Sequence, residues 1–411
     1  NISESDKFYV EKINIIGNYS TLEEVIRNNL IIDEGDPFNE ILFNKSVNNI
    51  QSLGIFKEVK TDVRDGSNQS FKEIDINVEE RPTGEISLTA GFGTTGETIG
   101  AGIKENNFLG KGIKLNTNLE LTADSVKGQF IYAKPNFNYS DNTLFTSVKS
   151  STTDLLTNSG YKTSEIGFSL GTEFEQFQNV FLSPEIDFLI EDLETSNKAS
   201  NVLKKQEGSY TDLYFNYSIN QDLRDKRFRT ESGYVTTFSQ ELPLLSDNAE
   251  LSNAFEITNY KKLSSTSDMV GKVSFFGKTI TGLSDDVRIS KRLTVPSHKL
   301  RGFQKGKVGP VDNNDYVGGN HISSLNLSAT LPNMVQGLDN LDFGVFLDAA
   351  NVWGVDYDSS IDDKSTLRSS AGVALNLMTP IGPLSFSFAN ALTKASSDKT
   401  ETFRFNLGTQ F

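Results

Sequence analysis

Hydrophobic and polar residues follow two different rhythms along the chain, and the rhythm changes near Pro82. Before that residue, segments with the two-residue period of strands occur together with segments that have the spacing of helices. In order, the pattern predicts a strand at residues 12–15, helices at 20–30 and 39–53, and strands at 55–63 and 74–78. We therefore expect a compact β-α-α-β-β domain of the α+β class over residues 1–82.

Two short motifs suggest where the helices of this domain begin and end. The letters STLE, from Ser20 to Glu23, have the form of a capping box, in which the serine caps the first turn of a helix. Gly54 follows the second helix at the place where a glycine often ends a helix in the left-handed conformation. Both predictions can be tested against the backbone geometry.

After Pro82 the helical spacing disappears, and alternating segments of about ten residues run to the end of the chain. In the segment at residues 384–388, Leu and Phe on one parity alternate with serine on the other. A sheet with one hydrophobic face and one face of small polar residues suits lipid outside and water inside. The pattern predicts an all-β transmembrane barrel of about sixteen antiparallel strands over residues 83–411.

The connectors between these segments differ in length, and we expect short turns to alternate with long loops, as in outer-membrane barrels. Residues 106–112 and 378–383 form short connectors, whereas residues 191–209 and the longest connector, between about 281 and 317, are long. The alternative is a β-sandwich, which would place aliphatic residues on the inner faces of two sheets and would not favour such regular alternation.

Composition narrows the possible functions. The 39 basic and 54 acidic residues give a net charge of −15, which argues against nucleic acid as a partner. The chain has no cysteine and two histidines, so we expect no metal site and no cofactor built on such ligands. No segment has the length of a membrane-spanning helix. The chain begins at Asn1 without an initiator Met or a signal peptide, so we expect a mature or trimmed sequence.

Two glycine motifs of enzymes occur, but their surroundings do not suit catalysis. GFGTTG, at residues 91–96, matches a dinucleotide-binding motif, yet the segment that follows is strand-like rather than helical. GFSLG, at residues 167–171, matches a nucleophile elbow, yet Ser169 falls in the middle of a predicted strand. We therefore expect a protein that is not an enzyme.

The longest connector carries one arginine of special interest. Arg301, in LRGFQKGKVGP, is either a solvated residue of a surface loop or a residue folded back into the barrel. In the second case a desolvated guanidinium needs an acidic partner. Asp348 interrupts the otherwise hydrophobic strand VFLDAANVW, an expensive position for an unpaired acid. We expect Asp348 to be this partner.

The chain ends in an alternating segment, ETFRFNLGTQF, whose hydrophobic parity includes Phe403, Phe405, Leu407 and Phe411. A closed barrel must pair its last strand, about residues 402–411, with its first, about residues 85–92. Gly408 has no side chain to pack and should loosen the last strand. A seam that opens there would expose an edge able to template an incoming strand.

Several motifs resemble the BamA family of outer-membrane assembly factors. LRGF, followed by GPVDNNDYVGG, resembles the arginine-glycine-phenylalanine loop of this family. FLDAANVW resembles the F-x-D strand, and residues 370–389 are similar to the penultimate hairpin. Residues 8–84 resemble the POTRA domain nearest the barrel, and NNFLGKG resembles a periplasmic turn. The family usually has several POTRA domains, so the chain is either cut short or a shorter relative.

The resemblance implies an insertase that folds β-barrel proteins into the bacterial outer membrane without ATP or a metal. It implies a loop-lock motif of Arg301, Gly302 and Phe303 held by Asp348, and a lateral seam between the first and last strands. The expected seam residues are Ile86, Ser87, Leu88, Thr89 and Ala90 on the first strand, and Phe403, Phe405, Leu407, Gly408 and Phe411 on the last.

The resemblance also implies partners and a location. The expected partners are nascent outer-membrane proteins, which end in a similar aromatic strand, accessory lipoproteins at a periplasmic POTRA domain, and the lipid bilayer. Two other functions remain open from the residues themselves. One is a secretion pore or passive channel of the same superfamily, and the other is an outer-membrane enzyme, for which no set of acid, base and nucleophile stands out.

Overall fold

The structure is a computed structural model that describes residues 7–94, 96–227, 229–264, 268–332, 341–379 and 382–407. Within these ranges, no helix has the length and apolar character needed to cross a membrane.

The N-terminal domain has the predicted order of elements. They are β1 (Tyr9–Ile16), α1 (Glu23–Arg27), α2 (Glu40–Ser52), β2 (Phe56–Asp65) and β3 (Phe71–Glu80). The sheet order is β1-β3-β2, with β1 parallel and β2 antiparallel to the central strand. Its core is mainly aliphatic and includes Ile13, Ile26, Ile50, Ile74 and Ile76. The hydrophobic faces that the strand and helix periods predicted therefore pack together in one core.

One of the two predicted helix ends is wrong. Helix α1 begins at Glu23, and its N-cap is Leu22, which makes no side-chain cap, so Ser20 is not part of a capping box. Instead, the backbone N–H groups of Ser20 and Thr21 donate to the carboxylate of Glu80 on β3. A tertiary acceptor has replaced the local one. The prediction for Gly54 is confirmed, because it follows α2 in the left-handed region at a φ of +68°.

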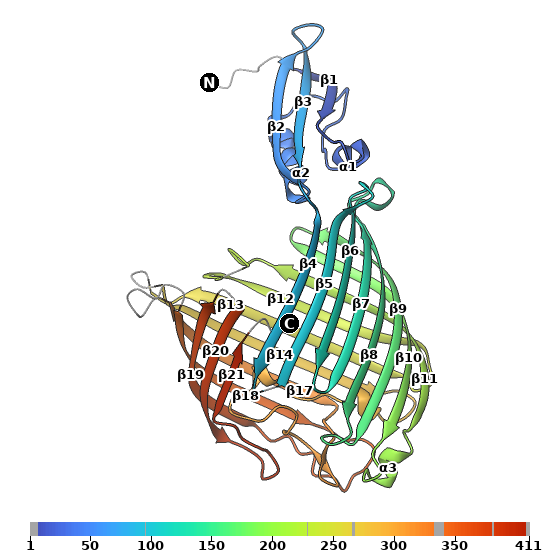
Figure 1. Cartoon of the computed structure of the whole chain (residues 1–411), viewed down its shortest axis with the longest axis vertical. Helices are drawn as coiled ribbons and strands as arrows, with labels where there is room; N and C mark the ends of the chain where they lie inside the picture. Colours follow the sequence, from blue (N-terminus) through green and yellow to red (C-terminus); the bar gives the residue numbers. More distant parts are fainter. Residues whose placement is uncertain are drawn as a thin grey trace. The chain divides into compact units, whose positions relative to one another are not determined.

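Sixteen antiparallel strands close into a barrel, as the sequence predicts (Figure 1). Strand β4 follows β3 along the chain and pairs with the last strand of the described chain, β21, so the barrel closes between its first and last strands. The strands are β4 (Gly84–Gly93), β5 (Gly96–Phe108), β6 (Ile113–Thr122), β7 (Ser125–Lys134), β8 (Thr143–Leu155), β9 (Tyr161–Phe177), β10 (Val180–Thr195), β11 (Gly208–Asp222), β12 (Gly233–Ser246), β13 (Glu250–Lys262), β14 (Val270–Gly282), β17 (His321–Pro332), β18 (Leu341–Trp353), β19 (Arg368–Thr379), β20 (Gly382–Thr393) and β21 (Phe403–Leu407).

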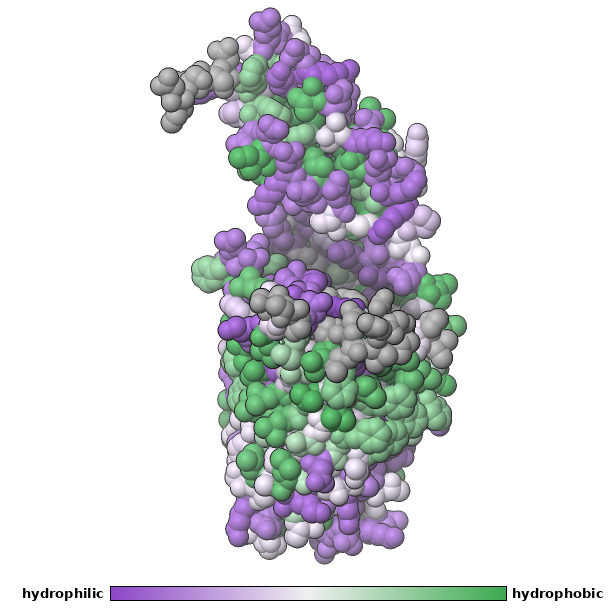
Figure 2. All heavy atoms as spheres, turned by 90° about the vertical axis from the view of Figure 1, so that its left-hand side faces the viewer, coloured by the Kyte–Doolittle hydropathy of each residue, from purple (hydrophilic) through white to green (hydrophobic). Residues whose placement is uncertain are grey.

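Hydrophobic side chains form the outer surface of the barrel. On β9, Phe168 and Leu170 are about half exposed, whereas Ser169 between them is buried and bonds to the Ser147 hydroxyl at 2.8 Å. Ser169 therefore lies within a strand, without the turn that a nucleophile elbow needs. Figure 2 shows a band of hydrophobic residues across one face of the barrel and hydrophilic residues towards its lower end. Such a band suits contact with lipid.

The predicted alternation of short and long connectors is only partly correct. The two-residue turn at residues 123–124 and the turn at 247–249 lie at the same end of the barrel as the long loops 196–207 and 283–320, because alternate connectors of an antiparallel barrel share an end. The connector at residues 223–232, at the other end, is longer than either turn. The longest connector is in the predicted place and runs from residue 283 to residue 320.

Candidate functional site

The long loop, residues 283–320, folds against the inner wall of the barrel. It contains the short helices η2 (Ile289–Lys291) and η3 (Ser297–Lys299) and the small hairpin of β15 (Val311–Asp312) and β16 (Asp315–Tyr316). Hydrophobic residues on the loop pack against residues of β17 and β18 in one buried cluster. Its members are Val295, Leu300, Phe303, Val308, Ile322, Ala350 and Val352.

Arg301 lies against Asp348, as the sequence predicts, and is not a solvated surface residue. Its Nε and Nη2 atoms donate to the two carboxylate oxygens at 2.7 and 2.8 Å, and its backbone N–H donates to the same carboxylate at 3.1 Å. Asp348 is fully buried and also accepts from Asn326 at 2.8 Å. The guanidinium carbon lies 3.4 Å from the ring centre of Phe346. The fork of arginine fits this bidentate site, which a lysine could not fill.

Gly302 and Phe303 are positioned by close packing. Gly302 has a φ of +86°, and a Cβ atom there would lie 3.1 Å from that of Ala389 and 3.2 Å from that of Ser370. The Phe303 side chain is buried in the loop cluster. Glycine is therefore needed at position 302 for backbone conformation and for space.

A second arginine of the loop, Arg288, was not singled out by the sequence analysis. Its side chain is fully buried, and Nη2 donates to Asp212 at 2.6 Å and to Glu250 at 3.2 Å. Its Nη1 donates to Glu191 at 3.1 Å. Burial alone would lower the pKa of Arg288, but the charges of Glu250 and Glu191 and the bond to Asp212 outweigh it and raise the pKa. The guanidinium therefore stays charged.

Further cations of the same loop meet acids of the barrel wall or of a neighbouring loop. Lys299 pairs with Glu256 at 2.7 Å, and Arg292 pairs with Asp356. Acids among the residues of the barrel strands, such as Glu191, Asp212 and Glu256, could have indicated these pairs, because a carboxylate on the inner wall needs a cation when a loop covers it. Glu191 was missed because the sequence predicted a connector at residues 191–209, whereas β10 continues to Thr195.

The described part of the seam between β21 and β4 is short. Among the described residues, the two strands share the register pairs Leu407 with Phe92 and Asn406 with Gly93. In comparison, β21 shares five pairs with β20, from Leu384–Leu407 to Phe388–Phe403. Few ladder hydrogen bonds hold the first and last strands together there.

The predicted seam residues are placed on these strands. Ile86, Ser87, Leu88, Thr89 and Ala90 lie on β4, but the described pairing with β21 falls at Phe92 and Gly93. Phe403, Phe405 and Leu407 lie on β21, and of these Leu407 pairs with β4. Gly408 and Phe411 lie outside the described residues.

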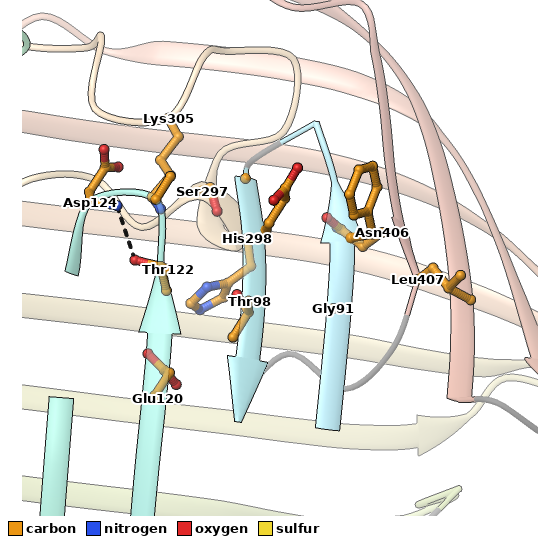
Figure 3. A pocket seen from close by; sticks show the side chains of 14 residues that line it. Gly91, Thr98, Glu120, Thr122, Asp124, Ser297, His298, Lys305, Asn406 and Leu407 are labelled. Atoms are coloured by element: carbon orange, nitrogen blue, oxygen red, sulfur yellow. Dashed lines mark hydrogen bonds between the residues drawn. The ribbon is translucent and has the colours of Figure 1, made fainter. Parts of the chain in front are cut away.

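A cavity of about 200 Å³ lies on the inner side of the seam (Figure 3). Loop residues Ser297, His298 and Lys305 line it together with β4, β5, β6 and the seam residue Asn406. Burial lowers the pKa of His298, which favours its neutral form. Among the described residues, no group of three or more His, Asp or Glu is placed to hold a metal ion.

Comparison with family models gives two matches. An Omp85 superfamily domain matches residues 107–411, and a POTRA model, described as a surface antigen variable number repeat, matches residues 8–81. The two matches leave residues 82–106 uncovered, so the predicted domain boundary after residue 82 stays a prediction.

Curated relatives include outer membrane protein assembly factors BamA. That of Neisseria meningitidis serogroup B is 25% identical over 466 residues, which take in 100% of this chain and 57% of the relative. That of Neorickettsia risticii is 24% identical over 421 residues, covering 100% of this chain and 56% of the relative. The chain thus spans little more than half the length of these relatives.

Solved structures share the fold. The crystal structure of BamA from Haemophilus ducreyi lacking POTRA domains 1-3 has a TM-score of 0.83 at 24% identity, covering 98% of this chain and 85% of that one. CdiB from Acinetobacter baumannii has a TM-score of 0.59 at 12% identity, covering 98% and 74%. Because the superfamily model covers most of its length, the chain belongs to the Omp85 superfamily, as an outer-membrane β-barrel with a POTRA domain.

Proposed function

We propose that this protein assembles β-barrel proteins into the outer membrane through the seam between β4 and β21. The observation that carries the proposal is the short seam, in which two register pairs join the described parts of the strands. An edge that few ladder bonds hold along its described part can separate and offer its backbone groups to another strand. The relatives named as BamA assembly factors support the same function.

The seam residues have roles in this proposal. The edge of β4, from Ile86 to Ala90, would template the incoming strand once β4 and β21 separate at Leu407. Arg301, Gly302 and Phe303 would act as the loop-lock motif, with Asp348 as its anchor on β18. The POTRA domain would lie in the periplasm and bind accessory lipoproteins. The bonds exchanged are hydrogen bonds between strands, so the proposed function is not enzymatic.

The packed loop argues against a passive channel as the main function. Residues 283–320 bury hydrophobic side chains against the inner wall, and several buried ion pairs hold them there. A lumen occupied in this way does not offer a steady path for solutes. A secretion pore of the same superfamily remains the alternative, and the following experiment separates the two.

A disulfide across the seam tests the proposal, because the native chain has no cysteine. Phe92→Cys with Leu407→Cys joins register partners on β4 and β21. Phe386→Cys with Phe405→Cys joins β20 to β21 and is the matched control. Both proteins are produced, oxidised, in cells whose own copy is depleted. We expect the seam pair to stop the appearance of new outer-membrane barrels, reduction to restore it, and the control pair to support it.

Two results would overturn the proposal. Normal barrel assembly by the fully oxidised seam pair would exclude an opening seam. Depletion that leaves the barrels of the outer membrane intact but removes one exported protein would replace assembly with secretion.

A further inference from the structure

The long loop is bonded to the connector that leads into the last strand. Phe303 and Thr400 form an antiparallel bridge, and on either side of it Gln304 N–H donates to Lys399 C=O and Glu401 N–H donates to Gly302 C=O, both at 3.0 Å. The residues directly after Arg301 therefore form a short stretch of sheet with the residues that precede β21.

Arg404, on the inner parity of β21, extends this contact into the strand itself. Its side chain is 7% exposed. Nη1 donates to the carbonyl of Ser297 at 2.7 Å, and Nη2 donates to the carbonyl of Phe303 at 2.6 Å. One side chain of the last strand thus bonds two points of the loop.

Glu401 completes the environment of this guanidinium. Its Oε2 atom accepts from Nε of Arg404 at 3.3 Å and from Nη2 at 3.0 Å. The carboxylate supplies the opposite charge that a buried guanidinium requires, while the two carbonyls fix its position. A lysine has no fork and could not reach both carbonyls at once.

The opposite side of the seam lacks such a link. Within the described ranges, no hydrogen bond or ion pair joins residues 283–320 to β4. The loop residues Ser297, His298 and Lys305 instead face β4 and β5 across the cavity at the seam (Figure 3). The two strands of the seam therefore differ in what holds them.

We infer that Arg404 is a positioning residue that fastens the last barrel strand to the long loop. The loop is held at its other side by Arg301 on Asp348, so β18, the loop and β21 form one mechanical unit. When the seam parts, β21 stays with the loop and β4 is the strand that is released. The inference rests on the proposed function for its role in assembly, but the physical coupling does not depend on it.

Amide hydrogen exchange of the purified full chain in lipid vesicles tests the coupling without any substrate. In the unaltered protein, residues 297–303 and 403–407 should both be protected from exchange, because the bonds of Arg404 between them add to the bonds that each segment makes with the barrel wall. Arg404→Met removes the two hydrogen bonds that the guanidinium donates to the carbonyls of Ser297 and Phe303. Amides of both segments should then exchange roughly tenfold faster or more. Protection of β17 and β18 should not change.

Three further variants separate the carbonyl contacts from a general effect of charge. Arg404→Lys keeps the charge but not the fork and should give an intermediate increase. Glu401→Gln keeps an acceptor and leaves both carbonyl contacts but removes the opposite charge, so exchange should rise less than in Arg404→Met. Arg224→Met removes an arginine of the connector 223–232 that pairs with Asp222 at the end of β11, and the two segments should not respond.

The results decide the inference in every case. Unprotected exchange of either segment in the unaltered protein overturns it, even if no variant folds, and so does a response of one segment alone to Arg404→Met. An effect of Glu401→Gln as large as that of Arg404→Met would show that charge alone matters, against the inference. If exchange responds as expected while barrel assembly in Arg404→Met cells is unaffected, the positioning role in assembly is wrong. If depletion of the native protein spares other barrels, the proposed function fails and the coupling stands.

Discussion

Arg301 and Asp348 form a bidentate ion pair between the long loop and β18, with N–O distances of 2.7 and 2.8 Å. Asp348 is fully buried, whereas the Arg301 side chain is 22% exposed. An acid in a hydrophobic strand and a cation in a loop therefore neutralise each other far from their sequence neighbours. Because the carboxylate is buried, substitution of either residue should change the free energy of unfolding measurably.

Arg301→Met should lower the free energy of unfolding by about 3 kcal/mol, because it leaves a buried carboxylate without its cation. Asp348→Leu should cost less, because the freed guanidinium can turn towards solvent. The double variant should cost less than the sum of the two. Denaturant unfolding in lipid vesicles measures all three, and additive effects would contradict the coupling.

Gly302→Ala should be more harmful than Gly306→Ala. Both glycines have positive φ values, +86° and +68°, so an alanine at either costs about 1 kcal/mol of backbone strain. A Cβ atom at position 306 meets nothing within 4 Å, whereas at position 302 it meets Ala389 and Ser370. We expect a further cost of about 1–3 kcal/mol at position 302 from overpacking. Equal unfolding free energies for the two variants would show that the close approach is not needed.

Arg288→Met should lower the free energy of unfolding by about 3–5 kcal/mol. The carboxylates of Glu191, Asp212 and Glu250 would then be buried close together without the guanidinium that neutralises them. Arg288→Lys should recover only part of the loss, since an ammonium cannot meet three separate carboxylates with the same geometry. Unfolding by denaturant measures both. Arg224→Met, at a more exposed pair, is the control and should cost about 1 kcal/mol or less.

Asp356 should contribute stability that depends on pH. Burial alone would raise its pKa, but the bonds from the Val287 N–H, Arg292 and Asn320 outweigh it, so the pKa lies below its usual 3.8. A lowered pKa in the folded state contributes stability above the usual pKa, and this is lost as the pH falls through the folded value. Unfolding free energies of the native protein and Asp356→Asn should therefore differ by a constant amount from pH 7 to about pH 5 and converge below about pH 4. A difference that grows with acid would contradict the sign.

The local pattern of hydrophobic and polar residues predicted an element correctly where its two faces meet different surroundings. The alternation of Leu and Phe with serine at residues 384–388 predicted a barrel strand, because lipid and lumen impose the two-residue period. It was less reliable at helix ends and connectors. Ser20 did not cap α1, because Glu80, sixty residues away in the chain, accepts its N–H instead. Such an acceptor leaves no trace in local spacing.

The sequence by itself determined the two-part organisation and a barrel of about sixteen strands, because both follow from periodicity. It also indicated Asp348 as a partner for Arg301, because an acid in a hydrophobic strand is costly unless it is paired, but it left open whether Arg301 folds into the barrel. Only the tertiary structure decided which acids receive Arg288 and that Arg404 bonds the carbonyls of Ser297 and Phe303. Carbonyl groups are the same at every position of the chain, so only their position in space distinguishes the two that accept from Arg404. The register of the strands and the closure of the barrel decide which residues face the loop, and no local sequence pattern encodes either of them.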